Sequence, residues 1–301
     1  MFFGVFIVLP IVILIIPLLL VIHIVKVETT DKPGIIIMVI ITLVSAIKLI
    51  FTQYYILPLT VLSVVFFAFF TAIMFPIKII CKRREKTCNT QYDSWVSEIK
   101  RKSFHAVVVL LFLPENLLKS LYFTGIDLLN PITAYSIDSI QDNFLKNALI
   151  IVTGALFICF TLFEFLRMDM KIYVYPREFL REHEEYEFAA YFYTAGACFF
   201  VSVFFKSTVI VSSITISLVY DAFSAIIGKM LGKRKIVENR TLEGTLAGFI
   251  VSTLAAAFFI PIYSAFVASF IICLIDIINK NNINDNLLFP ITSAFILWFL
   301  C

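Results

Sequence analysis

Ten apolar runs separated by polar segments constrain the fold of this chain more than any other feature. A helix needs about 20 consecutive apolar residues to cross the hydrocarbon core of a bilayer. The pattern therefore predicts an all-α, polytopic transmembrane bundle of about ten helices, in which Pro261 divides the long apolar stretch 244–279 in two. The runs lie at about residues 2–25, 35–51, 55–77, 104–121, 147–166, 188–205, 207–227, 245–260, 262–278 and 287–301.

The composition agrees with a membrane protein. Hydrophobic residues make up 61% of the chain, charged residues make up 15%, and the mean hydropathy is +0.98, whereas charged residues make up about a quarter of a soluble domain. The first apolar run has neither a basic segment before it nor a small-residue cleavage site, so we expect a retained helix rather than a signal peptide. The six cysteines are widely spaced, so we expect free thiols rather than a disulfide framework.

The charges of the connecting segments predict the orientation. Segments 78–102 and 228–243 are rich in Lys and Arg, so the positive-inside rule places them in the cytoplasm. The number of crossings then places 167–187 and 279–286 on the same side, whereas segment 122–146 is acidic. Four segments on one face are the arrangement that a shared site needs.

One polar stretch, which starts at Asp221, combines an acid, glycines and cations with the apolar runs around it. It begins D-A-F-S-A-I-I-G, and helical spacing places Asp221, Ser224 and Gly228 on one face. Small residues on that face allow close approach either of a ligand or of a neighbouring helix, as in a small-xxx-small packing seam. Because an unpaired carboxylate within a membrane is costly, we favour a phosphate and metal site completed by the basic cluster 233–235 and Glu243.

Two further segments carry polar residues at the ends of apolar runs. Arg101, Lys102 and His105 stand at the start of the run 104–121. Paired basic residues there are commonly anchors for lipid headgroups, but an intramembrane histidine usually faces a bundle interior or a wet cavity. The spacing of the polar turn 284–290 favours a helix cap.

Together these groups match the requirements of phosphoryl transfer. That reaction needs carboxylates to hold Mg²⁺, cations to spread the charge of a triphosphate, and an aligned acceptor hydroxyl. No Walker A sequence occurs in the chain, which excludes the P-loop class.

Over about residues 100–301 the motifs resemble those of dolichol kinases, in the same order. The first match is between R-K-S-F-H-A-V-V-V-L-L-F-L-P at 101–114 and the family's R-K-x-F-H…F-x-P segment. The second is between D-A-F-S-A-I-I-G…G-K-R-K…R-T-L-E-G-T and the family's D-x-x-A-x-x-x-G…basic…K-T-x-E-G-T segment. The third is between D-N-L-L-F-P and D-N-L-L-x-P, and F-E-F-L-R at 163–167 is similar to the family's F-E-x-x-R helix end.

The wider superfamily of CTP-dependent lipid kinases and cytidylyltransferases shares the acid, glycine and D-N motifs, whereas the F-H with a following F-x-P favours the dolichol branch. The chain departs from the family pattern at Tyr220, where Gly is common, at Arg240, where Lys is found, and at Glu115, where Gly is usual. Lys and Arg carry the same charge with different geometry. About three helices precede Arg101, which resembles a shortened version of the enzyme.

The resemblance implies an enzyme that transfers the γ-phosphate of CTP to the terminal hydroxyl of dolichol. The product, dolichyl phosphate, would serve protein glycosylation, and the site would face the cytoplasm at the endoplasmic reticulum membrane. CTP and Mg²⁺ are the implied donor and cofactor, and the lipid substrate and the bilayer are the implied partners, with no nucleic acid. Residues 1–100 would form the amino-terminal helices and a basic loop, and residues 101–301 the catalytic membrane region.

Roles for individual residues follow from the matched motifs. Asp221 and Glu243 are expected to act in catalysis and to coordinate Mg²⁺, with Asp285 a third candidate ligand. Either His105 or Asp221 would position the prenol hydroxyl. The residues expected to bind the nucleotide, as cations or as small and polar lining groups, are Arg101, Lys102, Ser224, Gly228, Gly232, Lys233, Lys235, Arg240, Thr241, Gly244 and Asn286.

Other functions stay open on the sequence. Within the superfamily the acceptor could be diacylglycerol or phytol, or the reaction could be cytidylyl transfer to phosphatidate. In a different class, an intramembrane acid such as Asp221 also suits an ion-coupled transporter. Against a transporter, the charged motifs cluster at one face and no inverted repeat is evident.

Overall fold

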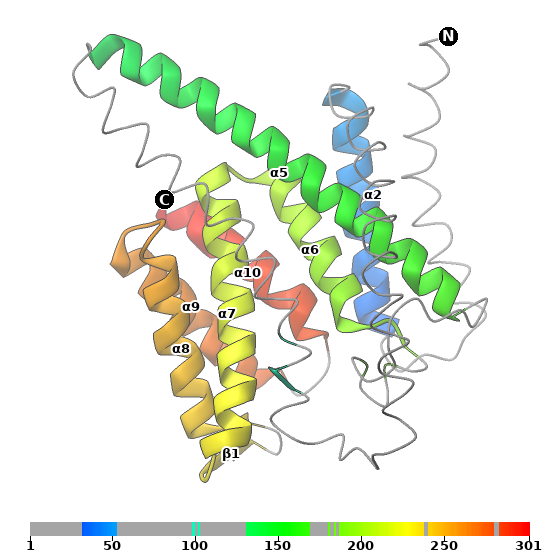
Figure 1. The fold of residues 1–301 in the computed structure, drawn as a ribbon, viewed down its shortest axis with the longest axis vertical. Helices are drawn as coiled ribbons and strands as arrows, with labels where there is room; N and C mark the ends of the chain where they lie inside the picture. The colour runs from blue at the N-terminus through cyan, green and yellow to red at the C-terminus, as the bar shows by residue number, and fades with distance from the viewer. Residues whose placement is uncertain are drawn as a thin grey trace, which may run out of the picture. The chain divides into compact units, whose positions relative to one another are not determined.

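The computed structural model describes residues 32–52, 98–99, 102, 131–168, 180, 184, 187–237, 240–279 and 283–301. Helices account for 85% of these residues, so this part of the chain is mostly helical. The expected helices at about 2–25, 55–77 and 104–121 lie outside the described residues, and the total of about ten stays a prediction. The described helices are α2 (Lys32–Thr52), α5 (Pro131–Met168), α6 (Ala190–Phe204), α7 (Ser207–Leu231), α8 (Leu242–Ala256), α9 (Ile262–Ile278) and α10 (Asp285–Leu300) (Figure 1).

Apolar runs located most of these helices to within about four residues, and α9 occupies the expected range. The start of α5 is the exception, because this helix begins at Pro131 and includes much of the segment 122–146 that we expected as a loop. Proline suits the first helical position, and neither Gly nor Pro follows it until Gly154. Nothing in the polar stretch breaks the helix, and hydropathy detected only its apolar part.

A short hairpin between α7 and α8 was not expected from the sequence. Strand β1 (Lys235–Val237) pairs antiparallel with β2 (Arg240–Thr241), and Lys235 lies opposite Thr241. Strand periodicity becomes readable only over about four to eight residues, so strands this short leave no clear signal in a basic loop.

The structure divides into two compact units, each built from separate segments of the chain. The first contains α2, α5 from Ile150, α6 and the segment Asn279–Leu288. The second contains Lys102, α5 up to Leu149, α7, the hairpin, α8, α9 and α10 from Phe289. The candidate residues of α7 and the hairpin therefore belong to the second unit.

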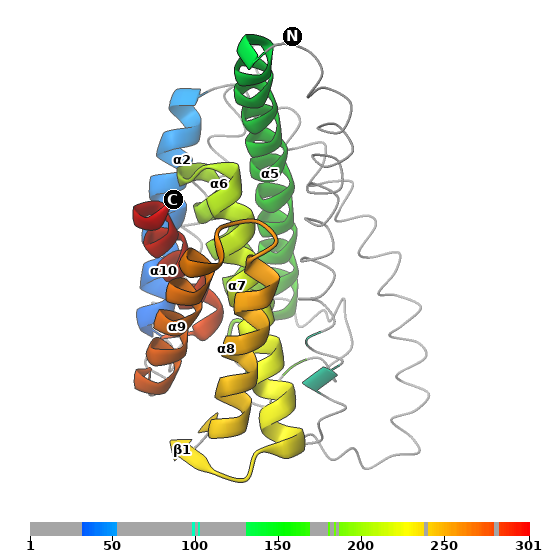
Figure 2. The ribbon, with the colours of Figure 1, turned by 90° about the vertical axis from the view of Figure 1, so that its left-hand side faces the viewer.

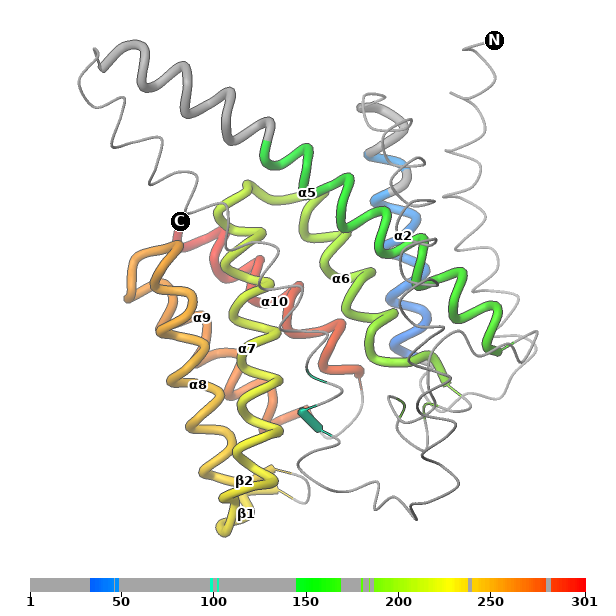
Figure 3. Tube along the Cα trace, viewed as in Figure 1, coloured from blue at the N-terminus to red at the C-terminus, as the bar shows by residue number. Residues whose placement is uncertain are grey.

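In the first unit, α2 packs closely against α6. The two helices run side by side (Figure 3). A Cβ atom added at Gly196 of α6 would lie 2.3 Å from the Cε of Met38 on α2, so the end of that flexible side chain occupies the space that the glycine leaves open. Phe157 of α5 stacks on Phe199 of α6 with ring centroids 5.8 Å apart. Small and aromatic residues thus pack together in the core of this unit.

A buried ion pair lies at the carboxyl end of α5 in the same unit. Arg167 pairs with Glu164, and Tyr191 of α6 donates a hydrogen bond to the same carboxylate. The Arg167 guanidinium also donates to the carbonyl of Glu184, at 2.6 Å. The F-E-F-L-R segment therefore holds the chain that leads into α6, because the buried Arg167 binds carbonyl groups of that chain as well as Glu164.

The second unit is organised around α7 and α8. After the hairpin α8 returns along α7, and α9 packs beside both (Figures 1 and 2). Ser217 of α7 and Ser293 of α10 share a buried hydrogen bond of 3.2 Å, which ties α10 to the same group of helices.

Two of the described helical segments, Leu145–Met168 and Ser207–Leu231, are long and apolar enough to cross a membrane. The shorter helices α8 and α9 also expose large apolar side chains at helical spacing, which places them on one face of each helix. Exposed apolar surface of this kind marks contact with a membrane or a partner. These side chains include Leu246, Ile250 and Leu254 on α8, and Phe266, Phe270 and Leu274 on α9.

Candidate functional site

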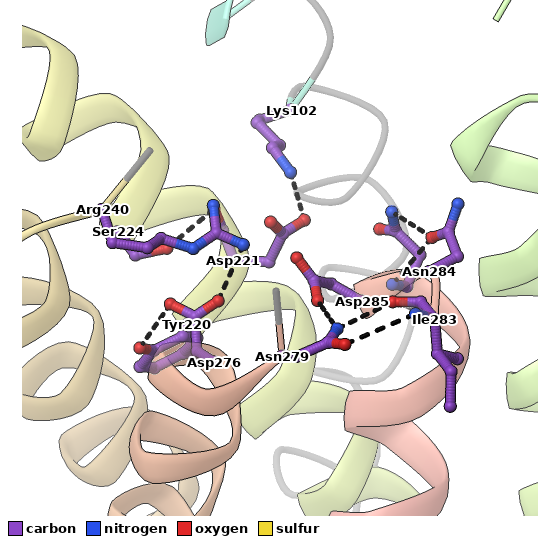
Figure 4. Close-up of polar contacts among 11 residues, drawn as sticks. Lys102, Tyr220, Asp221, Ser224, Arg240, Asp276, Asn279, Ile283, Asn284 and Asp285 are labelled. Carbon is purple, nitrogen blue, oxygen red and sulfur yellow. Dashed lines mark hydrogen bonds and ion pairs between the residues drawn. The ribbon is translucent and has the colours of Figure 1, made fainter. Parts of the chain in front are cut away.

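Asp221 lies well inside α7, which continues to Leu231. Its carboxylate forms an ion pair with the ammonium group of Lys102, and the two side chains are 17% and 5% exposed (Figure 4). The pair brings together two motifs that stand 119 residues apart in the sequence. The contact compensates a charge that would be costly if it were buried alone.

A second acid, Asp276 of α9, lies beside this pair and was not singled out from the sequence. Its Oδ1 accepts from the guanidinium of Arg240 at 2.8 Å, and its Oδ2 accepts from the hydroxyl of Tyr220 at 3.0 Å (Figure 4). The sequence did contain a signal for this residue, because Asp276 is the one acid in the apolar run 262–278 and an acid within such a run is costly unless it has a partner. Tyr220, a departure from the family pattern, is thus the partner of a buried carboxylate.

The inner polar group consists of Lys102, Tyr220, Asp221, Arg240 and Asp276. Tyr220 and Asp221 are neighbours in α7, so the two ion pairs lie side by side (Figure 4). With two acids and two cations the group is balanced in charge. Lys102, Asp221 and Arg240 were predicted, and the structure assembles them in one place.

The glycines of the predicted nucleotide site pack one helix on the other. A Cβ added at Gly244 of α8 would lie 2.5 Å from the carbonyl oxygen of Ser224 and 2.8 Å from the Cα of Gly228. A Cβ at Gly248 would lie 2.9 Å from the carbonyl oxygen of Tyr220. The close approach that we expected of a ligand is made here by α8, as in a packing seam. A role for Ser224, Gly228 and Gly244 in nucleotide binding stays a prediction.

Thr241 and Gly232 shape the turn between α7 and α8. The Thr241 hydroxyl accepts from the backbone N–H of Gly244 at 3.3 Å and caps α8. A Cβ at Gly232 would lie 2.6 Å from the Cγ2 of this threonine, so the end of α7 sits directly on the start of α8.

Glu243 holds the turn through backbone groups. Its Oε2 accepts from the N–H groups of Lys233 and Arg234, at 3.1 and 3.2 Å. Hydrogen bonds from its own N–H and from these two amides lower the pKa of this carboxyl, which lies outside the two candidate spans. The side chains of Lys233, Arg234 and Lys235 are exposed. We call these four residues the outer polar group.

The two polar groups are separated along α7. From Asp221 to Leu231 a helix rises about 15 Å, and the amide of Lys233 that binds Glu243 follows that helix end. Oxygen ligands of one Mg²⁺ stand about 2.1 Å from the ion and so about 4 Å or less from one another. In this structure the carboxylates of Asp221 and Glu243 therefore stand too far apart to coordinate one Mg²⁺ together, and the role of each as a ligand stays a prediction.

Asp285 and Asn286 belong to the first unit. The Asp285 carboxylate accepts from the amide of Asn279 at 2.6 Å, and the side chain of Asn284 accepts from the N–H of Asn286 at 3.1 Å. The expected helix cap at the start of α10 is confirmed. Within the described stretches no three His, Cys, Asp or Glu side chains lie together as a metal-binding group. Arg101 and His105 lie outside the described residues.

No protein family, curated protein or solved structure gives a match to this chain. The functional assignment therefore rests on the motifs and on the way in which the structure assembles them.

Proposed function

We propose that this chain is a polytopic membrane kinase that transfers the γ-phosphate of CTP to the terminal hydroxyl of dolichol. The observation that carries the proposal is the ion pair between Lys102 and Asp221. It joins the R-K-S-F-H motif to the D-A-F-S-A-I-I-G motif, and the resemblance to dolichol kinases requires both. The product, dolichyl phosphate, would serve glycosylation at the cytoplasmic face of the endoplasmic reticulum membrane.

The inner polar group supplies the residue types that this chemistry uses. Mg²⁺ in nucleotide sites is held by one or two carboxylates together with the phosphates, and the partly exposed Asp221 fits that role. The bound ion would neutralise charge on the triphosphate. Lys102 and Arg240 supply cations for the same phosphates, and His105 remains the candidate for positioning the prenol hydroxyl.

The outer polar group has a different part in the proposal. Lys233 and Lys235 are exposed just beyond the end of α7, where their charges attract CTP from solution. Glu243 holds the turn that presents them. The exposed apolar faces of α8 and α9 would contact the isoprenoid chain and the surrounding lipid.

The test is an assay of the detergent-solubilised full chain with CTP labelled in the γ-phosphate and with dolichol as acceptor. We expect labelled dolichyl phosphate from the wild type. Asp221→Ala should lower turnover at least about a hundredfold, because it removes a charged group at the reacting phosphates. Lys235→Ala, a change in the outer polar group, should lower it only about two- to fivefold.

Near-normal turnover of Asp221→Ala, at unchanged membrane expression, would remove this site from the reaction. Label found on diacylglycerol or phytol instead of dolichol would identify another lipid kinase. Transfer of label from the α-phosphate to phosphatidate would identify a cytidylyltransferase. Absence of any transfer, together with ion uptake into proteoliposomes that depends on Asp221, would favour a transporter.

A further inference from the structure

Asp276 occupies a position that two physical effects make unfavourable. It lies in the last turn of α9, where the helix dipole disfavours negative charge. Its side chain is also almost completely buried, which removes water from the carboxylate. An acid in such a place needs strong compensation, and it receives it from Arg240 and Tyr220.

Tyr220 holds the carboxylate in one orientation. Its ring is fully buried and stands edge-on to Phe289 of α10, with ring centroids 5.6 Å apart. The backbone at Tyr220 lies against Gly248 of α8, where no larger residue fits. Because the ring is fixed by packing, its hydroxyl fixes Oδ2 of Asp276 and leaves Oδ1 directed at Arg240.

Arg240 is held at both ends. Its backbone belongs to β2 and precedes Thr241, which caps α8. Its guanidinium binds Asp276, yet 29% of the side chain remains exposed, whereas the acid is 1% exposed. A cation that is fixed in place but still reachable from outside is preorganised to bind an anion.

We infer that Asp276 is a positioning residue that holds Arg240 for the phosphates of a bound nucleotide, and that Tyr220 sets the orientation of Asp276. The inference rests on the proposed function and deepens it, since the nucleotide there is CTP. Asp276 is too buried to touch a substrate, so it acts through Arg240.

The test measures equilibrium binding of CTP to the purified full chain in detergent, without lipid acceptor, by isothermal titration calorimetry. Arg240→Ala should weaken CTP binding about tenfold, the loss of one charge-assisted contact. Asp276→Asn should weaken it by a similar factor. In the double variant the loss should equal that of Arg240→Ala alone, because both changes remove the same contact.

Tyr220→Phe keeps the test decisive if the Asp276→Asn chain does not fold. It keeps the ring and its packing and removes only the hydroxyl, and we expect about threefold weaker CTP binding. In the kinase assay, Asp276→Asn and Tyr220→Phe should each raise the KM for CTP and leave kcat within about twofold of the wild-type value. A purely structural role would instead lower the amount of folded protein without changing the affinity of what remains.

Unchanged CTP affinity in both Asp276→Asn and Tyr220→Phe would overturn the inference while the kinase proposal stood. The same holds for a loss in the double variant that is the sum of the single losses. Inorganic tripolyphosphate separates the two proposals. If the wild type binds tripolyphosphate but not CTP, and both Arg240→Ala and Asp276→Asn weaken the binding of tripolyphosphate, then the phosphate site is supported and the proposed donor is wrong.

Discussion

At the scale of single residues, each acid of the second unit near the candidate site is balanced by a different kind of group. Asp221 faces a lysine, Asp276 faces an arginine and a tyrosine, and Glu243 faces two backbone amides. The buried Asp276 requires charged compensation and a second donor. The more exposed Glu243 needs only the backbone N–H groups of Lys233 and Arg234, in the turn that follows α7.

The hydrogen bonds of Glu243 predict a pH dependence of stability. Its pKa in the folded chain lies below the ordinary 4.5, so its contribution is present above pH 4.5 and is lost as the pH falls through the lower, folded value. Glu243→Gln should therefore be less stable than the wild type at pH 7, and the difference should shrink towards pH 3. Thermal unfolding midpoints across this range measure the effect.

A difference between Glu243→Gln and the wild type that stays constant from pH 7 to pH 3 would contradict the assignment of these hydrogen bonds to the ionised carboxylate.

At the scale of elements, the contact between α7 and α8 determines where the polar groups lie. Gly244 and Gly248 bring the backbone of α8 against Ser224 and Tyr220 of α7. This approach determines where α8 starts along α7. It therefore also determines the position of Arg240 on the preceding strand, from which the guanidinium reaches Asp276. A packing seam thus assembles the inner polar group.

Two glycine substitutions measure this seam. Gly244→Ala places a Cβ 2.5 Å from a backbone oxygen, so the helices must separate, and we expect a loss of about 1–3 kcal/mol of unfolding free energy. At Gly228 the nearest atom is the Thr241 hydroxyl at 3.1 Å. There the better helix propensity of alanine, about 1 kcal/mol, offsets the tighter contact, and the net change should be small.

Denaturant unfolding of the two variants in the same detergent gives the comparison. A Gly228→Ala chain that is destabilised as much as Gly244→Ala would show that the α7–α8 distance is not set where the structure places it.

At the scale of the whole molecule, the described helices expose apolar side chains to an extent that suits lipid. Phe299 of α10 and Ile278 of α9 are 79% and 74% exposed, and Phe258, in the turn that follows α8, is 78% exposed. Water would disfavour each of these surfaces by about 25 cal/mol per Å². Hydrocarbon surroundings remove that penalty, and the polar seams between helices then supply the specific contacts.

This surface predicts how the chain fractionates. After expression, alkaline carbonate should leave it in the membrane pellet, and only detergent should release it, because an integral helix is held by burial of its apolar length. A peripheral membrane protein expressed in parallel is the control. Release of this chain by carbonate would contradict a membrane-spanning arrangement.

Sequence alone predicted the helical class and, among the described helices, most of the boundaries, because hydropathy and helical period are local properties of the sequence. It also singled out Asp221, Lys102 and Arg240, since charges beside apolar runs are conspicuous. It misplaced the start of α5 at the polar boundary, because a helix continues through polar residues until something breaks it.

The pairing of these residues was decided only by the tertiary structure. Lys102 meets Asp221 across 119 residues, and Arg240 meets Asp276 on a different helix. The same glycine face suits a ligand or a neighbouring helix equally well by spacing, and in the fold α8 occupies it. The group that pairs with a buried charge, or that packs on the backbone of a glycine, depends on which residues long-range packing brings next to it. No local pattern contains that information.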